Sequence, residues 1–268
     1  MAATIGASLI MNVTWLYAHG ISKGRIIMKA IKVIGGFLLG FALCFGLALA
    51  LIEPIKGWIR QKYSNDAVEY MEEQIIHGSG VITYNVPKSD ALAIEGEEGE
   101  EDVGLDKLLR DMQAISGEHE SLTLLGILEI PCIDVKEPIW DTCSTNALRY
   151  GVGRYPGTVN IGESGLCNLF GHRQIGNLDA KLGSIQYLQE HIGEEVVVTT
   201  TDGTMHIYKI VKTIYVKDSE LMPYLDPNAY DKETLCITAC GWGEDPVTGK
   251  TYARNTEFIV VCEPVDED

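Results

Sequence analysis

The most marked hydrophobic feature of the sequence is an apolar run from Val33 to Ile52, VIGGFLLGFALCFGLALALI, which contains no charged residue. A helix of this length rises about 30 Å, the thickness of a bilayer core. A buried core helix would show a polar face, which this run lacks. A cleaved signal peptide would have a shorter apolar core, although Ala48 and Ala50 fit a cleavage site. We therefore expect an uncleaved transmembrane signal-anchor at 33–52.

A different pattern begins at Leu124, where short β-rich runs alternate with turn signals. The dipeptide Asp202-Gly203 between two of these runs predicts a β-hairpin. Helical signals are confined to 144–151, where Ser144 is a candidate N-cap, and to 178–190. Many short strands with two small helices predict a mostly β fold, a closed or nearly closed barrel. The expected strands are 124–131, 134–140, 166–172, 194–200, 204–216, 234–240 and 256–262.

Residues 53–123 join the apolar run to the β-rich region, and we expect them to form a linker or stalk. The stretch 57–79 has the composition of a polar helix, and 105–120 that of a second, short one. Six acids occupy the eight positions 95–102, and such a run repels itself and buries nothing. The alternative, a cation site, lacks the spacing of a Ca²⁺-binding loop. The run therefore predicts a disordered, solvated spacer.

The distribution of charge along the chain is more informative than its total. The 268 residues are 46% hydrophobic and carry a net charge of −17, which excludes global disorder and argues against a nucleic-acid partner. Residues 1–32 carry +4, 53–123 carry −10 and 124–268 carry −11. This asymmetry agrees with a single pass through the plasma membrane, with 1–32 cytoplasmic and the acidic region after the span extracellular. Because Met28 opens a short basic segment before the apolar run, our hypothesis is that 1–27 are an over-long gene start.

The seven cysteines have several possible roles. Cys44 lies in the apolar run, and the other six could pair in 15 ways. On one strand, Cys236 and Cys240 would lie about 13 Å apart, too far for a local disulfide, and their spacing is a weak metal signal. We expect most of these thiols to be small core side chains.

Two residues suggest chemistry instead. His172 ends one apolar run, and Cys240 ends another and is followed by Gly241, which leaves its sulfur uncrowded. A cysteine beside a histidine forms a common nucleophile, because the thiolate is the reactive form and an imidazolium lowers the thiol pKa. An arginine could then stabilise an oxyanion, and Arg254 is the only arginine after Cys240. On spacing alone, a purely structural role for both residues stays open.

Five segments, in the same order, resemble the sortases, the membrane-anchored cysteine transpeptidases of Gram-positive bacteria. They are similar to the opening strand, the helix and turn after it, the segment with the catalytic histidine, the next hairpin, and the strand that ends in the nucleophile. The resemblance implies an eight-stranded sortase β-barrel at 124–265, behind the anchor and linker. The segments are LGILEIP (125–131), NALRYGVGRYPGT (146–158), GESGLCNLFGHR (162–173), VVVTTTDGTMHIYKI (196–210) and CITAC (236–240).

The resemblance also implies roles for individual residues. The Cys240 thiolate would attack the carbonyl after Thr in an LPXTG-like sorting signal of a surface protein or pilin. His172 would protonate the leaving amine, and Arg254 would hold the substrate and the oxyanion, with Arg173 and Arg154 as fallback candidates. An amine from a cell-wall peptide or a pilin lysine would then release the acyl group. No metal or organic cofactor is implied, and the Ca²⁺ that some members use is not carried over.

Some positions depart from the family pattern. Ala239 replaces the usual threonine before the nucleophile, and residues 255–257 separate Arg254 from the final apolar run, so either that strand starts earlier or a bulge re-aims the arginine. Cys236 is a rival nucleophile that we expect to be buried. The short connection 219–233 lacks the long helical insertion of class B enzymes. Two alternatives are a membrane-anchored cysteine peptidase (a hydrolase) and an inactive barrel that acts as a binding module.

Overall fold

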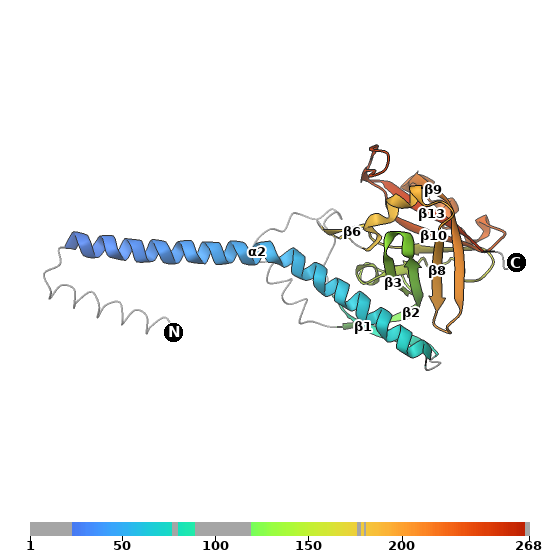
Figure 1. Cartoon of the computed structure of the whole chain (residues 1–268), viewed down its shortest axis with the longest axis horizontal. Coiled ribbons are helices and arrows are strands. Elements are labelled where there is room, and N and C mark those ends of the chain that lie inside the picture. Colours follow the sequence, from blue (N-terminus) through green and yellow to red (C-terminus); the bar gives the residue numbers. More distant parts are fainter. Residues whose placement is uncertain (1–22, 77–79, 89–118, 176–177, 180, 266–268) are drawn as a thin grey trace. The chain divides into compact units, whose positions relative to one another are not determined.

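The computed structural model describes residues 23–76, 80–88, 119–175, 178–179 and 181–265 (Figure 1). The expected acidic spacer at 95–102 and most of the expected helix at 105–120 lie outside these residues. The chain divides into two compact units, Met1–Ile52 and Glu53–Asp268.

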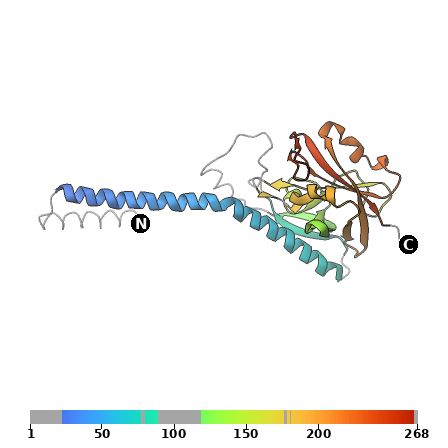
Figure 2. The same cartoon turned by 45° about the horizontal axis from the view of Figure 1, so that its top comes forward.

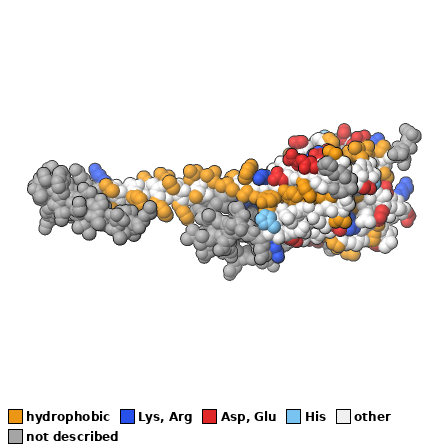
Figure 3. Space-filling model, turned by 90° about the horizontal axis from the view of Figure 1, so that it is seen from below, with side chains coloured by type: hydrophobic (Ala, Val, Ile, Leu, Met, Phe, Trp, Pro, Cys, Tyr) orange, Lys and Arg blue, Asp and Glu red, His pale blue; other side chains and the backbone are white. Residues whose placement is uncertain are grey.

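Helix α2 (Lys23–Ile76) contains the whole apolar run. Its window Ile31–Ala48 has a mean hydropathy of 2.1, and none of that window is buried. Figure 3 shows the apolar side chains exposed along this part of the helix. In length and composition, this is the one helix of the described residues that could cross a membrane.

The second half of α2 has a buried face within the unit that begins at Glu53. Buried side chains recur at three- and four-residue intervals, as on one face of an α-helix. They belong to Lys56, Arg60, Ser64, Ala67 and Met71.

Three kinds of contact join this half of α2 to the strands. The Ser64 hydroxyl donates a hydrogen bond to the Glu137 carboxylate. Lys136 Nζ lies 2.7 Å from Glu72 Oε1. A core cluster containing Ala67 and Met71 also includes Trp140. The polar helix expected at 57–79 is thus part of α2 and packs against the strands.

Eight strands close into the expected barrel (Figures 1 and 2). They follow the order β2-β3-β4-β5-β10-β13-β9-β8, and β8 pairs back with β2. At this seam the backbones are close, because a Cβ on Gly126 would lie 2.7 Å from the Thr199 carbonyl oxygen. The strands are β2 (His119–Ile130), β3 (Val135–Trp140), β4 (Val152–Arg154), β5 (Leu166–Phe170), β8 (Glu195–Thr200), β9 (Met205–Lys217), β10 (Thr234–Cys240) and β13 (Thr256–Pro264).

Strand β1 (Ile82–Pro87) extends the sheet beside the first half of β2, in antiparallel register from Ile82↔Leu124 to Pro87↔His119. Two small hairpins pair β6 (Gln174–Ile175) with β7 (Leu178–Asp179), and β11 (Gly243–Glu244) with β12 (Thr251–Tyr252). The remaining elements are 3₁₀ turns. They are η2 (Pro131–Ile133), η3 (Ala147–Arg149), η4 (Lys181–Glu190), η5 (Asp218–Glu220), η6 (Met222–Tyr224) and η7 (Pro227–Ala229).

Both expected short helices are 3₁₀ rather than α-helical. At 144–151 the helix is reduced to the single turn η3, although the Ser144 Oγ accepts a hydrogen bond from the Ala147 N–H at 3.2 Å, as expected of an N-cap. In η4 the buried residues Leu182, Ile185 and Leu188 are spaced by three. Three residues is the period of a 3₁₀ helix, so this spacing buries one face of η4 against the barrel core.

Candidate active site

Cys240 and His172 lie at the ends of two neighbouring parallel strands. β5 and β10 pair in parallel from Thr234↔Leu166 to Thr238↔Phe170. The pairing continues one step further, because the Gly171 N–H donates to the Thr238 carbonyl at 3.0 Å. Extending this register by two residues places His172 opposite Cys240, and neighbouring strands lie about 4.8 Å apart. The register therefore puts the two residues that the sequence predicts just at, or two residues beyond, the ends of neighbouring strands.

Alternation along β10 decides which side of the barrel carries the thiol. Ile237 and Ala239 point into the main core. Cys236 therefore points to the opposite face with Cys240, where Tyr224 and other residues of the β9–β10 connection pack on a second core cluster. The candidate site thus lies on the outer face of the barrel wall.

A buried polar network supports this face below the site. Asn168, on β5, is fully buried. Its Oδ1 accepts a hydrogen bond from the Thr238 hydroxyl at 3.0 Å, and its Nδ2 donates to the Tyr224 carbonyl at 2.5 Å. One amide therefore ties together both site strands and the connection that covers them.

Cys236, the rival nucleophile, is fully buried in mid-strand, as expected. Burial raises the pKa of its thiol to about 12. Cys240 is more accessible because it ends the strand. The glycine that follows Cys240 has a structural reason, since a Cβ on Gly241 would lie 2.8 Å from backbone atoms of Glu257 and Phe258 on β13. The glycine thus allows the chain to turn away immediately after the thiol.

The surroundings keep both candidate residues uncharged at neutral pH. Burial, and then the nearby charge of Glu257, raise the pKa of Cys240 to about 11, although Arg173 and a hydrogen bond with the Trp242 side chain act in the opposite direction. Burial, then Arg149 and Arg60, lower the pKa of His172 to about 4. The Cys240 thiol and the His172 imidazole are therefore both uncharged at neutral pH.

His172 has a second notable property. Its Nε2 is buried and has no hydrogen-bond partner among the described residues. Buried ring nitrogens are normally satisfied by a partner, so an unpaired one is a candidate point of contact for a substrate group.

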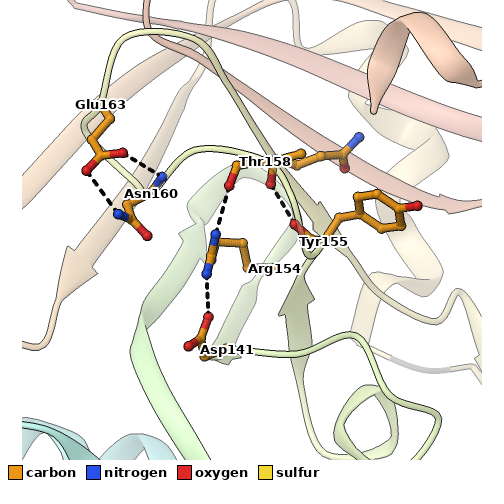
Figure 4. A network of polar contacts seen from close by, with 7 residues as sticks. Asp141, Arg154, Tyr155, Thr158, Asn160 and Glu163 are labelled. Carbon is orange, nitrogen blue, oxygen red and sulfur yellow. Dashed lines mark hydrogen bonds and ion pairs between the residues drawn. The ribbon is translucent and has the colours of Figure 1, made fainter. Parts of the chain in front are cut away.

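The three candidate arginines have different environments. Arg173 is buried, and it donates from Nε to the Cys240 carbonyl at 3.0 Å and from Nη2 to the Trp242 carbonyl at 2.6 Å. Arg154 donates to the Thr158 carbonyl and pairs with Asp141 at 2.6 Å, within the turn network of Figure 4. Both guanidiniums thus hold backbone in place.

Arg254 is exposed in the turn before β13, with its guanidinium 5.8 Å from the centre of the Trp242 ring. β13 begins at Thr256, after this arginine. The register shift between β13 and β9 falls between Val261 and Cys262, well beyond the site. Neither an earlier strand start nor a bulge at this point re-aims Arg254, and the residue that pairs with Cys240 is Glu257.

The loop after Cys240 carries the side chains of Trp242 and Arg254. Asp245 anchors this loop. This carboxylate is buried and accepts hydrogen bonds from the Val247 and Thr248 N–H groups and from Gln189 Nε2.

The sequence did not single out Trp242 or Glu257. For Trp242, the available signal was an indole directly after Cys-Gly. The position of Glu257 depends on strand register, which the sequence does not give. Within the described part of the chain, no group of three or more His, Cys, Asp or Glu residues could hold a metal ion.

Comparison with known proteins identifies the family. A family model of the sortase domain matches residues 128–265, half of the chain. The chain belongs to the sortase family. Sortases are membrane-anchored or cell-surface transpeptidases. The expected fold is confirmed, and membership of the family supports a sortase-type transpeptidase in general. No curated protein matches this sequence.

Several solved sortase structures are similar to this chain at low identity. A Clostridium perfringens sortase D5 transpeptidase is 24% identical, with 53% of this chain and 79% of that chain covered and a TM-score of 0.44. C. perfringens sortase C with a C-terminal cell wall sorting motif is also 24% identical, with coverage of 54% and 71% and a TM-score of 0.44. A lid mutant of sortase A from Corynebacterium diphtheriae is 16% identical, with coverage of 76% and 94% and a TM-score of 0.46.

Proposed function

We propose that this sortase cleaves an LPXTG-like sorting signal and joins the released surface protein or pilin to an amine. Cys240 is the nucleophile and His172 the general acid and base. The observation that supports this proposal is the parallel register of β5 and β10, because His172 and Cys240 lie at the carboxyl ends of these two neighbouring strands. The amine belongs to a cell-wall peptide or to a pilin lysine.

The reaction follows from the neutral thiol and imidazole. Substrate binding excludes water, and His172 accepts the thiol proton as the Cys240 sulfur attacks the carbonyl after threonine. The same proton then passes to the nitrogen of the leaving amine, and a thioacyl enzyme remains. The incoming amine gives a proton to His172 as it displaces the thiolate, and His172 then returns that proton to the sulfur. Arg254, exposed beside Trp242, is the candidate that contacts the substrate.

The anchor completes the proposal. We place the apolar part of α2 across the plasma membrane as a single span, with the barrel outside the cell and the acidic segment as a spacer. The exposed apolar surface of Ile31–Ala48 supports this arrangement, because no described part of the chain covers it.

The test uses the full chain in lipid nanodiscs and a panel of LPXTG-like peptides. Mass spectrometry should find a thioacyl group on Cys240, and neither Cys240→Ala nor His172→Ala should turn over. Cys236→Ala is the matched control, because it removes a buried thiol from the same face of the same strand and should leave turnover in place. Wild-type rates in Cys240→Ala would refute the assignment.

The reaction products and an experiment in cells test the two alternatives. Addition of an amine acceptor should convert the acyl enzyme into an amide product. Hydrolysis that no acceptor diverts would instead favour a membrane-anchored peptidase. Unchanged attachment of surface proteins in cells carrying Cys240→Ala would favour an inactive binding module.

A further inference from the structure

Glu257 faces Cys240 directly across the sheet. β10 and β13 are antiparallel, and their register pairs these two residues. The neighbouring Gly241 N–H donates to the Thr256 carbonyl at 2.8 Å. Hydrogen-bonded and non-hydrogen-bonded pairs alternate along an antiparallel ladder, so Cys240 and Glu257 form the non-hydrogen-bonded kind, whose Cα atoms are about 4.5 Å apart. Paired side chains lie on the same face, and the carboxyl is therefore beside the sulfur.

The other neighbours of Glu257 disfavour its charged form. On β9 its partner is Val216, which is buried and apolar. Asp218 follows just beyond the end of that strand, where its N–H binds the Asn255 carbonyl at 3.1 Å. Burial, and then the charge of Asp218, raise the pKa of Glu257 to about 7. This carboxyl therefore retains its proton in a substantial fraction of molecules at neutral pH.

The neighbouring cations Arg173, Arg254 and Lys217 bind other groups or point away from the Glu257 carboxyl. Arg173 binds two backbone carbonyls, and Arg254 lies exposed over the Trp242 ring. Lys217 is one register position away on β9 and so points to the other face. His172 is expected to be neutral, because its pKa is lowered to about 4.

We propose that Glu257, in its neutral form, donates a hydrogen bond to the carbonyl oxygen of the scissile bond and stabilises the oxyanion that forms on it. This inference rests on the proposed function and adds a catalytic residue to it. A carboxylic acid kept neutral by its site can serve as an oxyanion donor, because its O–H needs no net charge to stabilise developing negative charge. The Trp242 side chain lies beside the same sulfur, where its hydrogen bond lowers the pKa of the Cys240 thiol.

The step balances without a further reactant. As the bond between the sulfur and the carbonyl carbon forms, the thiol proton moves to His172 and the π electrons of the C=O bond move to its oxygen. Glu257 keeps its proton and only donates a hydrogen bond. When the C=O bond re-forms, the C–N bond breaks and His172 gives its proton to the leaving nitrogen.

The test compares the single-turnover rate of thioacyl-Cys240 formation on both sides of pH 7, with the full chain in nanodiscs and an LPXTG-like peptide. Glu257→Ala should lose about 100-fold in rate, the usual effect of removing one oxyanion donor. Glu257→Gln should retain most of the rate, because its amide N–H can also donate. The rate of the wild type relative to Glu257→Gln should fall as the pH rises above 7, since only the wild type ionises.

Two further variants test the assignment. Glu263→Gln removes an exposed acid from the same strand and should change neither the rate nor its pH dependence. Asp218→Asn should move the fall in rate to lower pH, because the charge of Asp218 helps to hold the proton on Glu257. If Glu257 had only a structural role, Glu257→Ala would be less stable. The ratio of acylation rates between the wild type and Glu257→Gln would then not change with pH.

The possible failures are distinguishable. If the wild type forms no thioacyl-Cys240 with any peptide of the panel, the proposed function is overturned, and this inference with it. If the wild type reacts but Glu257→Ala reacts at the same rate, or the ratio to Glu257→Gln does not change with pH, only the role of Glu257 is overturned.

Discussion

Replacing Glu257 with glutamine should stabilise the barrel at alkaline pH and leave its stability unchanged in acid. Burial and the charge of Asp218 raise the pKa of this carboxyl from 4.5 to about 7 in the folded protein. The folded state therefore binds this proton more tightly than the unfolded state does. The free energy of unfolding consequently falls as the pH rises from 4.5 to 7. Above pH 7 the carboxylate is ionised in both states, and the full destabilisation of the folded state is present.

The size of the effect follows from the same shift in pKa. One pKa unit corresponds to about 1.36 kcal/mol, so the rise to about 7 costs the folded state at most about 3–4 kcal/mol. The side chain of Glu257 is only partly buried, and solvent screening reduces this cost. We therefore expect Glu257→Gln to raise the free energy of unfolding by about 1–2 kcal/mol above pH 7.

Pulse proteolysis in urea, on the full chain in nanodiscs, measures this difference directly. Wild type and Glu257→Gln should unfold at the same urea concentration in acid and diverge as the pH rises. Glu263→Gln, at an exposed position of β13, should show no such divergence. A gain in stability that is equal at all pH values, or largest in acid, would refute the reasoning.

Three other substitutions test the support of the site and the closure of the barrel. Arg173→Gln removes the positive charge that lowers the pKa of the Cys240 thiol, so this pKa should rise further and peptide-level alkylation of Cys240 should slow. Asn168→Ala leaves a buried carbonyl and a buried hydroxyl without their partner, and urea unfolding should show a loss of about 2–3 kcal/mol. Gly126→Ala places a methyl group against the Thr199 carbonyl at the β2–β8 seam and should cost about 1–3 kcal/mol by the same assay. Unchanged values in these assays would contradict each expectation.

The barrel could be predicted because its signals are local. Each expected strand from 124 onward is present, since alternation and turn dipeptides are read over short windows. The bounds agree within two residues, except that β2 begins five residues before its expected start. At Asp202-Gly203, for example, Gly203 has a φ of 83°, the left-handed backbone that the hairpin signal implies.

Elements that depend on distant partners could not be predicted in this way. β4 is three residues long and exists because β3 and β5 flank it. Likewise, β1 is defined by its pairing with β2 rather than by its own pattern. The docked face of α2 presents Lys56, Arg60 and Ser64 to the interior, so by polarity alone it does not read as a buried face.

The same distinction separates the site residues that the sequence predicts from those that it does not. His172 and Cys240 each end an apolar run, and each can be recognised from its own neighbours in the chain. Glu257 has no such signal, because a glutamate at the start of a final strand normally faces solvent. It becomes a candidate only when the register of β10 and β13 places it beside the thiol. The residues that follow Cys240 in the sequence therefore point to Arg254 as the group that stabilises the oxyanion. The residues beside Cys240 in space point to Glu257 instead. The pH dependence of acyl-enzyme formation separates these two assignments, because an arginine does not titrate in this range.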